Sequence, residues 1–371
     1  MADDIISMLP DQVLCHILSF LPIHIAAATS ILSKRWTPLW LSVPSLYFDD
    51  RSYLLNNNKP YDCFNKFIYK TIVARDAHLP IRMFRLKCRA SNFELSDYDL
   101  NTWINAATQR GLEDLHIKLP ITSTTVLRMS RVFSCKTLVV LKLTGLDVNV
   151  FSFVDLPSLK TLHLSQVGFP KPQYLMELLC GCPILEDMYL YNITYVDTST
   201  PSDKNFKSLS KLVRAFIYKI GLDIPLMAIC SIQFLLIDKY CDAIPVFPNL
   251  TRVDLIFGSD MSWHFVLSML KKCPKLQILK LVMRKSSHVA VWAFPCFVPE
   301  CLSSQLKTCF IMNYKGASEL HFAKYIMENS RALLTMAIGT TSSSKLEDKF
   351  QQLKELSSYP RTSPICQLLF I

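Results

Sequence analysis

Thirteen cysteines are the side chains in this sequence that could most readily support chemistry, because thiolates bind zinc, attack as nucleophiles and form disulfides. Their spacing does not match these roles. Cys180 and Cys182 flank a single glycine, no Cys-x-x-Cys pair occurs, and no second half-site follows at zinc-finger spacing. An odd number of cysteines scattered along 371 residues predicts buried, reduced thiols, so we expect neither a metal site nor a disulfide framework.

Glycine spacing excludes several catalytic and nucleotide-binding motifs. The chain has only 8 glycines, and the closest two, Gly168 and Gly181, are 13 positions apart. The patterns GxGxxG, GxxxxGK[ST] and GxSxG each need two glycines within about six positions, and the zinc-protease pattern HExxH is also absent. We therefore predict that the chain is not an enzyme and that it uses no cofactor.

Hydropathy and charge narrow the class of protein further. The most apolar run, residues 289–302, is short and contains Pro295 and Pro299, so it cannot span a bilayer. The acidic N-terminus lacks the basic region of a signal peptide, which predicts a cytoplasmic or nuclear protein or one found in both places. Residues 1–50 carry five aspartates against one lysine and one arginine, a net charge of −3. Because the whole chain has a net charge of +10, the remaining residues carry +13. Such a division predicts two parts with different partners.

Residues 5–48 have the pattern of a small helical unit. A first helix is expected from Pro10-Asp11 to a stop at Pro22, a second from Ile23 to Leu32, and a third restarting at Thr37-Pro38. Apolar residues recur in the first helix at spacings of three and four, at Val13, Leu14, Ile17, Leu18 and Leu21. A unit this short cannot bury all its apolar side chains, so they must pack either on a partner or on the rest of this chain.

The order LPDQVLCHILSFLP followed by AAATSILSKRWTPLW closely resembles the F-box of plant F-box proteins with leucine-rich repeats, over about the first 50 residues without a gap. The resemblance implies docking onto a Skp-type adaptor and, through it, onto the cullin and RING subunits of a ubiquitin ligase. Asp4-Ile5 departs from the Asp-Arg common in that family but lies outside the apolar face. The adaptor contacts that the resemblance implies are Leu9, Pro10, Val13, Ile17, Leu18, Leu21, Pro22, Leu32, Ser33, Trp36 and Trp40.

From residue 81 onward the chain repeats the pattern LxxLxL. Ten segments fit it, at starts 18 to 31 residues apart: Ile81, Leu112, Leu138, Leu159, Leu185, Leu212, Ile232, Leu250, Leu276 and Leu306. This irregular period is typical of leucine-rich repeats, in which each unit is a short strand plus a helix or loop. We expect an α/β solenoid with a parallel sheet on its concave face and helices or loops on its convex face.

After residue 296 the pattern changes, and VPECL, YIMENSRAL and SPICQLLF resemble in order the FBD domain that follows repeats in many plant F-box proteins. Capping the end of the solenoid is its expected role, and the strand at Cys366–Phe370 is expected to be buried on both faces. The predicted domains are the F-box (1–50), a linker or N-terminal cap (51–80), leucine-rich repeats (81–295) and the FBD domain (296–371).

The leading functional hypothesis is a substrate-recognition subunit of an SCF-type E3 ubiquitin ligase, with the repeats binding a target protein. The alternative is a ligase-independent binding scaffold. Nucleic-acid binding is disfavoured, because the basic residues are dispersed and lack interleaved aromatics. No residue identifies a small-molecule co-ligand.

Alternation in LxxLxL directs the residues between the leucines outward across the sheet. An acidic segment of the target is predicted to meet the basic early repeats, and an apolar side chain to dock on the aromatic middle ones; the alternative is that the FBD domain or a loop buries these rings. The outward positions are Arg85, Lys87, His116, Lys118, Lys142, His163, Tyr189, Tyr191, Phe216, Tyr218 and Lys280.

Overall fold

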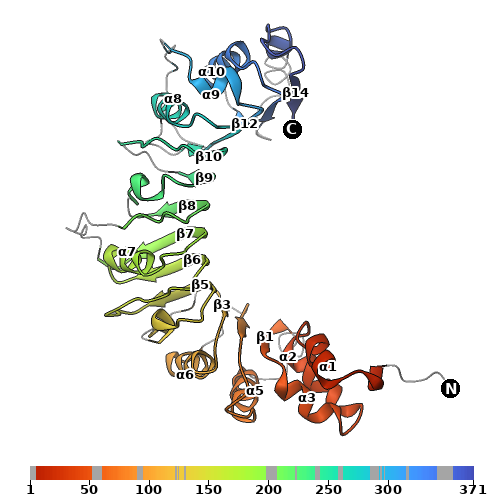
Figure 1. Ribbon diagram of the computed structural model, residues 1–371. Helices are drawn as coiled ribbons and strands as arrows, with labels where there is room; N and C mark the ends of the chain where they lie inside the picture. Colours follow the sequence, from red (N-terminus) through yellow and green to blue (C-terminus); the bar gives the residue numbers. More distant parts are fainter. Residues whose placement is uncertain are drawn as a thin grey trace, which may run out of the picture. The chain divides into compact units, whose positions relative to one another are not determined.

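The computed structural model describes the main part of the chain as short helices alternating with parallel strands (Figure 1). The described residues are 6–51, 61–89, 95–121, 123, 125–128, 131–197, 207–221, 224–238, 243–257, 262–284, 292, 295, 297–314, 317–340 and 354–371. They belong to two compact units. The first comprises Met1–Leu185 with Asn192–Asn205, and the second Glu186–Tyr191 with Phe206–Ile371. The division falls inside β7 (Asp187–Tyr195).

The N-terminal helices confirm the predicted three-helix module with small shifts. They are the 3-10 turn η1 (Ile6–Met8), α1 (Asp11–Leu18), α2 (Ile23–Ala28) with its 3-10 extension η2 (Thr29–Ile31), and α3 (Trp36–Ser42). The third helix starts at Trp36, one residue before the predicted restart. Pro38 then lies in its first turn, where a missing N–H costs no intrahelical hydrogen bond.

The first unit continues as a parallel sheet. Its neighbouring strands are β1 (Ser45–Asp49), β2 (Met83–Lys87), β3 (Asp114–Lys118), β5 (Val140–Val148) and β6 (Thr161–Phe169), and β4 (Val126–Leu127) pairs with the end of β5. The connections carry α5 (Tyr61–Val73), α6 (Asp97–Thr108), the 3-10 turn η3 (Val132–Ser134) and α7 (Pro172–Cys180). Ser96 caps α6 by accepting a hydrogen bond from the Tyr98 N–H, as its sequence predicts.

The second unit repeats the arrangement. Its strands after β7 are β8 (Arg214–Ile220), β9 (Phe234–Ile237), β10 (Arg252–Phe257), β11 (Ile278–Met283), β12 (Thr308–Tyr314), β13 (Thr335–Thr340) and β14 (Gln367–Phe370). Between them lie the 3-10 turn η4 (Leu226–Ile229), α8 (Trp263–Lys272), α9 (Glu300–Ser304) and α10 (Ala317–Asn329). The strands from β8 to β14 pair in parallel with their sequence neighbours.

All ten predicted LxxLxL segments contain a strand, which confirms the leucine-rich-repeat architecture. The inward leucines are completely buried, as Leu141 and Leu143 of β5 and Leu162 and Leu164 of β6 illustrate. Side chains between them stay half-exposed or exposed on the other side of the sheet, which we call the open face. Each strand therefore supplies a core row and an open-face row from one short sequence.

Left-handed residues bend the longer strands at matching positions. Gly145 on β5 has φ of 71°, and Gln166, Asn192 and Lys219 on β6, β7 and β8 have φ of 55°, 52° and 53°. A Cβ atom at Gly145 would lie 2.4 Å from the carbonyl oxygen of Leu119, so this position needs glycine for both backbone and space. The three non-glycine residues gave no sequence signal for the bend.

Two expectations need correction at the ends of the repeats. The strand β1 lies inside the predicted F-box range and pairs with β2, so the solenoid sheet begins well before residue 81. At the other end, β14 is not buried on both faces: Leu369 is 44% exposed, because β14 pairs with β13 along one edge and the described residues leave much of it uncovered. The resemblance to the FBD domain also implies a turn out of a strand at Gly316, which lies outside the described residues.

Candidate functional site

Helix α1 carries apolar side chains on two faces. Leu14 and Leu18, one turn apart, are buried in the module. Val13 and Ile17, also one turn apart, remain 41% and 44% exposed. A helix of a folded domain normally presents polar residues on the face away from its core, so the second apolar face indicates a surface that a partner completes.

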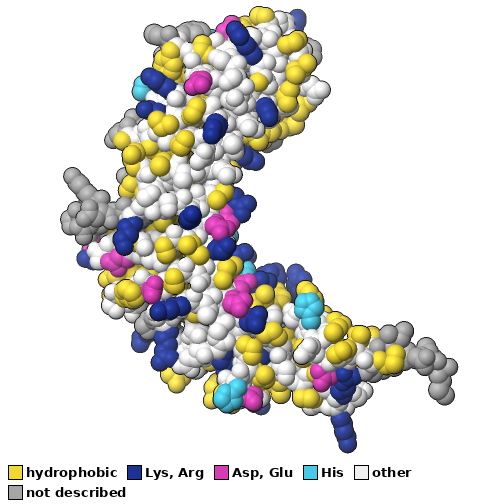
Figure 2. Space-filling view, viewed as in Figure 1, with side chains coloured by type: hydrophobic (Ala, Val, Ile, Leu, Met, Phe, Trp, Pro, Cys, Tyr) yellow, Lys and Arg dark blue, Asp and Glu magenta, His cyan; other side chains and the backbone are white. Residues whose placement is uncertain are grey.

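Further apolar side chains are exposed on the N-terminal module, and Figure 2 shows yellow side chains on the surface of the N-terminal helices. Phe20 follows α1, Ile25 lies on α2, and Ile31 and Leu32 end the second helical segment. Ile31 is 86% and Phe20 is 74% exposed. We call the exposed apolar residues Val13, Ile17, Phe20, Ile25, Ile31 and Leu32 the F-box face.

The other predicted adaptor residues fall into two groups. Pro10 and Ser33 are exposed, whereas Leu9, Leu21, Pro22 and Trp40 are half-buried and still accessible at the surface. Leu18 and Trp36 differ, because their side chains are buried and only 2% and 7% exposed. We assign these two residues to the core of the module, where they hold the helices that carry the F-box face.

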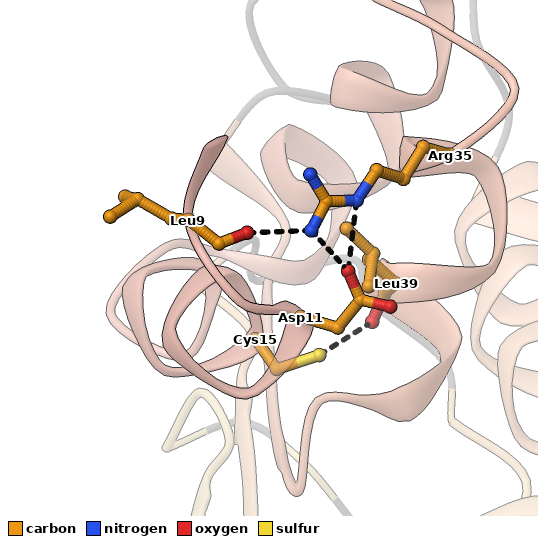
Figure 3. Close-up of polar contacts among 5 residues, drawn as sticks. All are labelled: Leu9, Asp11, Cys15, Arg35 and Leu39. Atoms are coloured by element: carbon orange, nitrogen blue, oxygen red, sulfur yellow. Dashed lines mark hydrogen bonds and ion pairs between the residues drawn. The ribbon is translucent and has the colours of Figure 1, made fainter. Parts of the chain in front are cut away.

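Arg35 joins the two halves of the F-box motif (Figure 3). Its Nη2 donates to Asp11 Oδ1 at 2.6 Å and to the carbonyl oxygen of Leu9 at 2.6 Å, and its Nε donates to the same carboxylate at 2.9 Å. The thiol of Cys15 donates to the carbonyl oxygen of Leu39 at 3.5 Å, which ties α1 to α3. Sequence reasoning missed Arg35 and Asp11, because a contact between residues 24 positions apart leaves no periodic signal.

The buried cysteines behave as small core side chains. Cys182 and Cys273 are completely buried, as their place in the Cys-Pro segments predicted. Burial raises the pKa of the Cys182 and Cys301 thiols to about 12, so both stay protonated at neutral pH. Within the described residues, no group of three or more His, Cys, Asp or Glu side chains could hold a metal ion, and no helix there has the length and apolar character needed to cross a membrane.

The basic early repeats come together in a groove of about 940 Å³ on the open face of the first unit, which we call the basic groove. Strand register arranges its side chains in two rows. One row runs Arg85, His116, Lys142 and His163 across β2, β3, β5 and β6. The other runs Lys87, Lys118, Thr144 and Ser165 across the same strands. Neighbours within a row are one strand spacing, about 4.8 Å, apart.

Two arginines beside the groove are already paired. Arg85 Nη2 lies 2.5 Å from Asp114 Oδ2, and Arg89 Nη2 lies 3.4 Å from Asp49 Oδ2. The Asp49 carboxylate also accepts a hydrogen bond from the Tyr47 hydroxyl at 2.8 Å. Hydrogen bonds and the Arg89 charge keep the pKa of Asp49 below its usual value although burial opposes them.

The groove lysines lack such partners. No carboxylate oxygen of the described residues lies within 4.0 Å of the amines of Lys87, Lys118 or Lys142. Burial, and after it the charges of Lys142, His116 and Lys118, lowers the pKa of His163 to about 4. The pKa of His116 is lowered by burial and then by Lys142 and Arg85. The imidazole of His163 is thus neutral at neutral pH, and the positive charge resides on the lysines.

The four predicted aromatic residues also come together, in the second unit. Tyr189 stacks on Phe216 with ring centroids 4.2 Å apart, and Tyr191 stacks on Tyr218 at 5.4 Å. Arg284 lies over the Tyr218 ring at 4.9 Å and pairs with Asp238 at 2.9 Å.

All four rings of this aromatic array remain half-exposed, so the described part of the chain does not bury them. Their role in target binding stays a prediction. Lys280 is half-buried on β11 and belongs to neither cluster.

Comparison with known proteins found three matching family profiles. Residues 6–47 match the F-box domain profile. Residues 100–216 match a profile described as "FBD-associated F-box protein At5g56370, LRR repeats". Residues 295–338 match the FBD profile. The resemblances drawn from the sequence are thereby confirmed.

Relatives cover nearly the whole chain. FBD-associated F-box protein At4g10400 of Arabidopsis thaliana is 31% identical over 425 residues, which span 99% of this chain and 100% of that protein. FBD-associated F-box protein At3g52670 of the same plant is 30% identical over 414 residues, which span 99% and 97%. F-box/FBD/LRR-repeat protein At4g26340, also from this plant, is 29% identical over 426 residues, which span 99% and 100%. With its F-box, parallel leucine-rich-repeat sheet and FBD segment, the chain belongs to the plant FBD-associated F-box proteins with leucine-rich repeats.

Proposed function

We propose that this chain is the substrate-recognition subunit of an SCF-type E3 ubiquitin ligase. The F-box binds a Skp-type adaptor, the adaptor connects the chain to cullin and RING subunits, and the repeats bind a target protein. Ubiquitin transfer takes place on other subunits, so this chain needs no catalytic group of its own. We propose that the protein functions in the cytoplasm, the nucleus or both, and the distribution of a fluorescent fusion protein would test this localisation.

The F-box face carries the proposal. Its side chains remain exposed although the module packs other apolar residues inside, and Arg35 fixes the helix ends that present them. Exposed apolar patches mark protein-binding surfaces, and a few anchor residues supply most of the binding free energy at such surfaces. The alternative, a ligase-independent scaffold, shares the repeats but leaves the F-box vestigial or bound to another partner.

Co-purification with a Skp-type adaptor tests the proposal. In the double variant Ile17→Asp and Leu32→Asp, two exposed anchors become charged, and we expect adaptor capture to fall by about a hundredfold or more. The matched control changes Val150→Asp and Phe153→Asp, which are similarly exposed apolar residues of the repeats. It should bind the adaptor normally.

Adaptor binding that survives the F-box change, or that is absent from the unchanged protein, would contradict the receptor function and favour the scaffold. Thermal melting of both variants checks that each is folded. Detection of ubiquitinated proteins bound to the repeats, dependent on the F-box face, would separate an active receptor from an adaptor-bound scaffold.

A further inference from the structure

The basic groove contains positive charge that the described residues do not neutralise by ion pairs. Lys87 and Lys118 lie directly opposite each other on β2 and β3, and Lys142 lies on β5 in the neighbouring row, opposite His116. Like charges on facing positions of neighbouring strands destabilise a sheet. Over the described residues, no carboxylate lies within 4.0 Å of the three amines. A ligand that brings negative charge would remove this cost, so the groove is suited to an anion.

The groove also limits what kind of anion fits. Arg85 and Arg89 are paired with Asp114 and Asp49, so among the described groove residues the arginine and lysine charge without a carboxylate partner lies on three lysine side chains. A nucleic acid carries a phosphate at every step and binds where basic contacts continue along its path. Three isolated amines instead match a short group of carboxylates.

The size and polarity of the groove favour a polypeptide. About 940 Å³ is far more than one inorganic anion fills and lies at the upper end of the usual ~300–1,000 Å³ for ligand sites. Beside the lysines, Thr144, Ser165 and Gln166 line the groove with hydroxyl and amide groups. These groups can donate to and accept from a peptide backbone. Alternate side chains of an extended segment lie roughly 6–7 Å apart, a distance that flexible lysine stems can follow across strands about 4.8 Å apart.

We propose that the basic groove binds an acidic, extended segment of the target protein, with glutamate or aspartate carboxylates at Lys87, Lys118 and Lys142. The inference rests on the proposed receptor function, since it takes the repeat-bound partner to be a protein. It assigns the acidic part of target recognition to the first unit alone and needs no contribution from the aromatic array.

Fluorescence anisotropy with the full-length protein tests the inference. The probe is a short fluorescein-labelled peptide with alternating glutamates, and its partner peptide has glutamine at the same positions. Titrations at about 50 mM salt keep electrostatic contacts measurable, because screening lengths then exceed ~10 Å. The groove variant is Lys118→Glu with Lys142→Glu. The matched control, Arg128→Glu with Lys136→Glu, makes the same change in net charge at exposed residues that do not line the groove.

We expect the glutamate peptide to bind the unchanged and control proteins alike. The glutamine peptide and the groove variant should each weaken binding by about tenfold or more. Thermal melting confirms folding, and Lys118→Gln with Lys142→Gln replaces the groove variant if charge reversal unfolds the protein.

Three results would overturn the inference: equal binding of the two peptides, equal losses in groove and control variants, or no loss in the groove variant. A single-stranded oligonucleotide that displaces the probe better than the unlabelled glutamate peptide would make the groove a nucleic-acid surface and would also overturn it. Adaptor co-purification of the same variants keeps the two proposals separate. A groove variant that retains the adaptor but binds the peptide normally contradicts the acidic-segment inference and leaves the receptor function standing.

Discussion

The basic groove and the aromatic array are both formed by the outward residues of the LxxLxL repeats. They differ in the contacts that their side chains make within the chain. In the array, Tyr189 and Phe216 stack on each other, and Arg284 pairs with Asp238 while it covers Tyr218. In the groove, Lys87 and Lys118 face each other across β2 and β3, and Lys142 lies in the other row on β5, all three without a carboxylate partner in the described residues.

This difference indicates which of the two clusters is more in need of a binding partner. Clustered aromatic rings are typical of binding surfaces, but rings that stack on their neighbours already gain part of that energy within the chain. Clustered like charges gain nothing from one another. The groove therefore indicates a missing partner more strongly than the array does, although the array had the clearer signal in the sequence.

The largest effects should come from the leucines beneath both clusters, and they should be equal. Leu143 under the groove and Leu190 under the array are completely buried. Replacing either with alanine removes the same contacts and leaves a cavity, so we expect each to lower the free energy of unfolding by about 2–5 kcal/mol. Urea denaturation measures this, with Leu143→Met and Leu190→Met as volume-conserving controls that cost less than about 1.5 kcal/mol.

A loss of unfolding free energy below about 1 kcal/mol at only one of the two leucines would show that the cores beneath the groove and the array are not equally well packed. That result would contradict the expected equality. Repeat proteins can lose two-state behaviour, so the unfolding transition of each variant needs to be followed with two probes.

Stacking in the array predicts the next largest effect. A double-mutant cycle with Tyr189→Ala and Phe216→Ala isolates the coupling between the two rings, whose centroids are 4.2 Å apart. We expect a favourable coupling of about 0.5–1.5 kcal/mol. The same cycle with Lys87→Ala and Lys118→Ala, which face each other across β2 and β3, should give a coupling of the opposite sign, since these charges repel. Coupling energies of the same sign in the two cycles would contradict the distinction between rings that attract each other and lysines that repel each other.

The sequence predicted the repeats well because their determinants are local. Two buried leucines at alternate positions define each strand, so the ten LxxLxL segments located ten strands and the rows of open-face residues. The F-box was equally accessible, since its helices and apolar face lie within one continuous segment. One strand was missed: at β1 (Ser45–Asp49) the spacing of the template falls on Val43, Leu46 and Phe48, of which only one is a leucine, and pairing with β2 identifies the strand.

Contacts between distant residues were the part of the site that the sequence could not provide. Arg35 reaches Asp11 across 24 positions, and Arg89 reaches Asp49 across 40. Neither pair follows a period, and each depends on how the elements between them fold. Register decided the groove in the same way, because only pairing of β2, β3 and β5 places the lysines side by side.

The groove should also make stability depend on pH. The pKa of His163 is lowered to about 4, from roughly 6.5 in an unfolded chain, by burial and then by Lys142, His116 and Lys118. Between these two values the unfolded state binds more protons, so stability rises with pH and is lost as pH falls from about 6.5 towards 4. Because the side chain is half-exposed, solvent screening reduces the effect below what the pKa difference alone implies.

His163→Gln should flatten this part of the stability profile, measured as melting temperature between about pH 4 and 7. The array provides the control, since Phe216→Leu changes no titrating group and should leave the slope unchanged. An unchanged slope in His163→Gln would mean that burial and the neighbouring charges do not lower the pKa of this imidazole in the folded protein.

The smallest effect concerns the lysines themselves and has the sign that most directly separates the two clusters. Lys118 lies opposite Lys87, with no carboxylate of the described residues within 4.0 Å, so its charge is a cost in the absence of ligand. Lys118→Ala should therefore raise the free energy of unfolding, by a few tenths of a kcal/mol to about 1 kcal/mol for a solvent-exposed pair. Added salt should reduce that gain, because it screens the repulsion that the substitution removes. Arg284→Ala in the array should do the opposite, since it breaks the 2.9 Å pair with Asp238 and uncovers the Tyr218 ring. If urea titrations at low and high salt showed Lys118→Ala to be destabilising, the lysines would already be compensated within the chain, and the case for an acidic partner in the groove would lose its energetic basis.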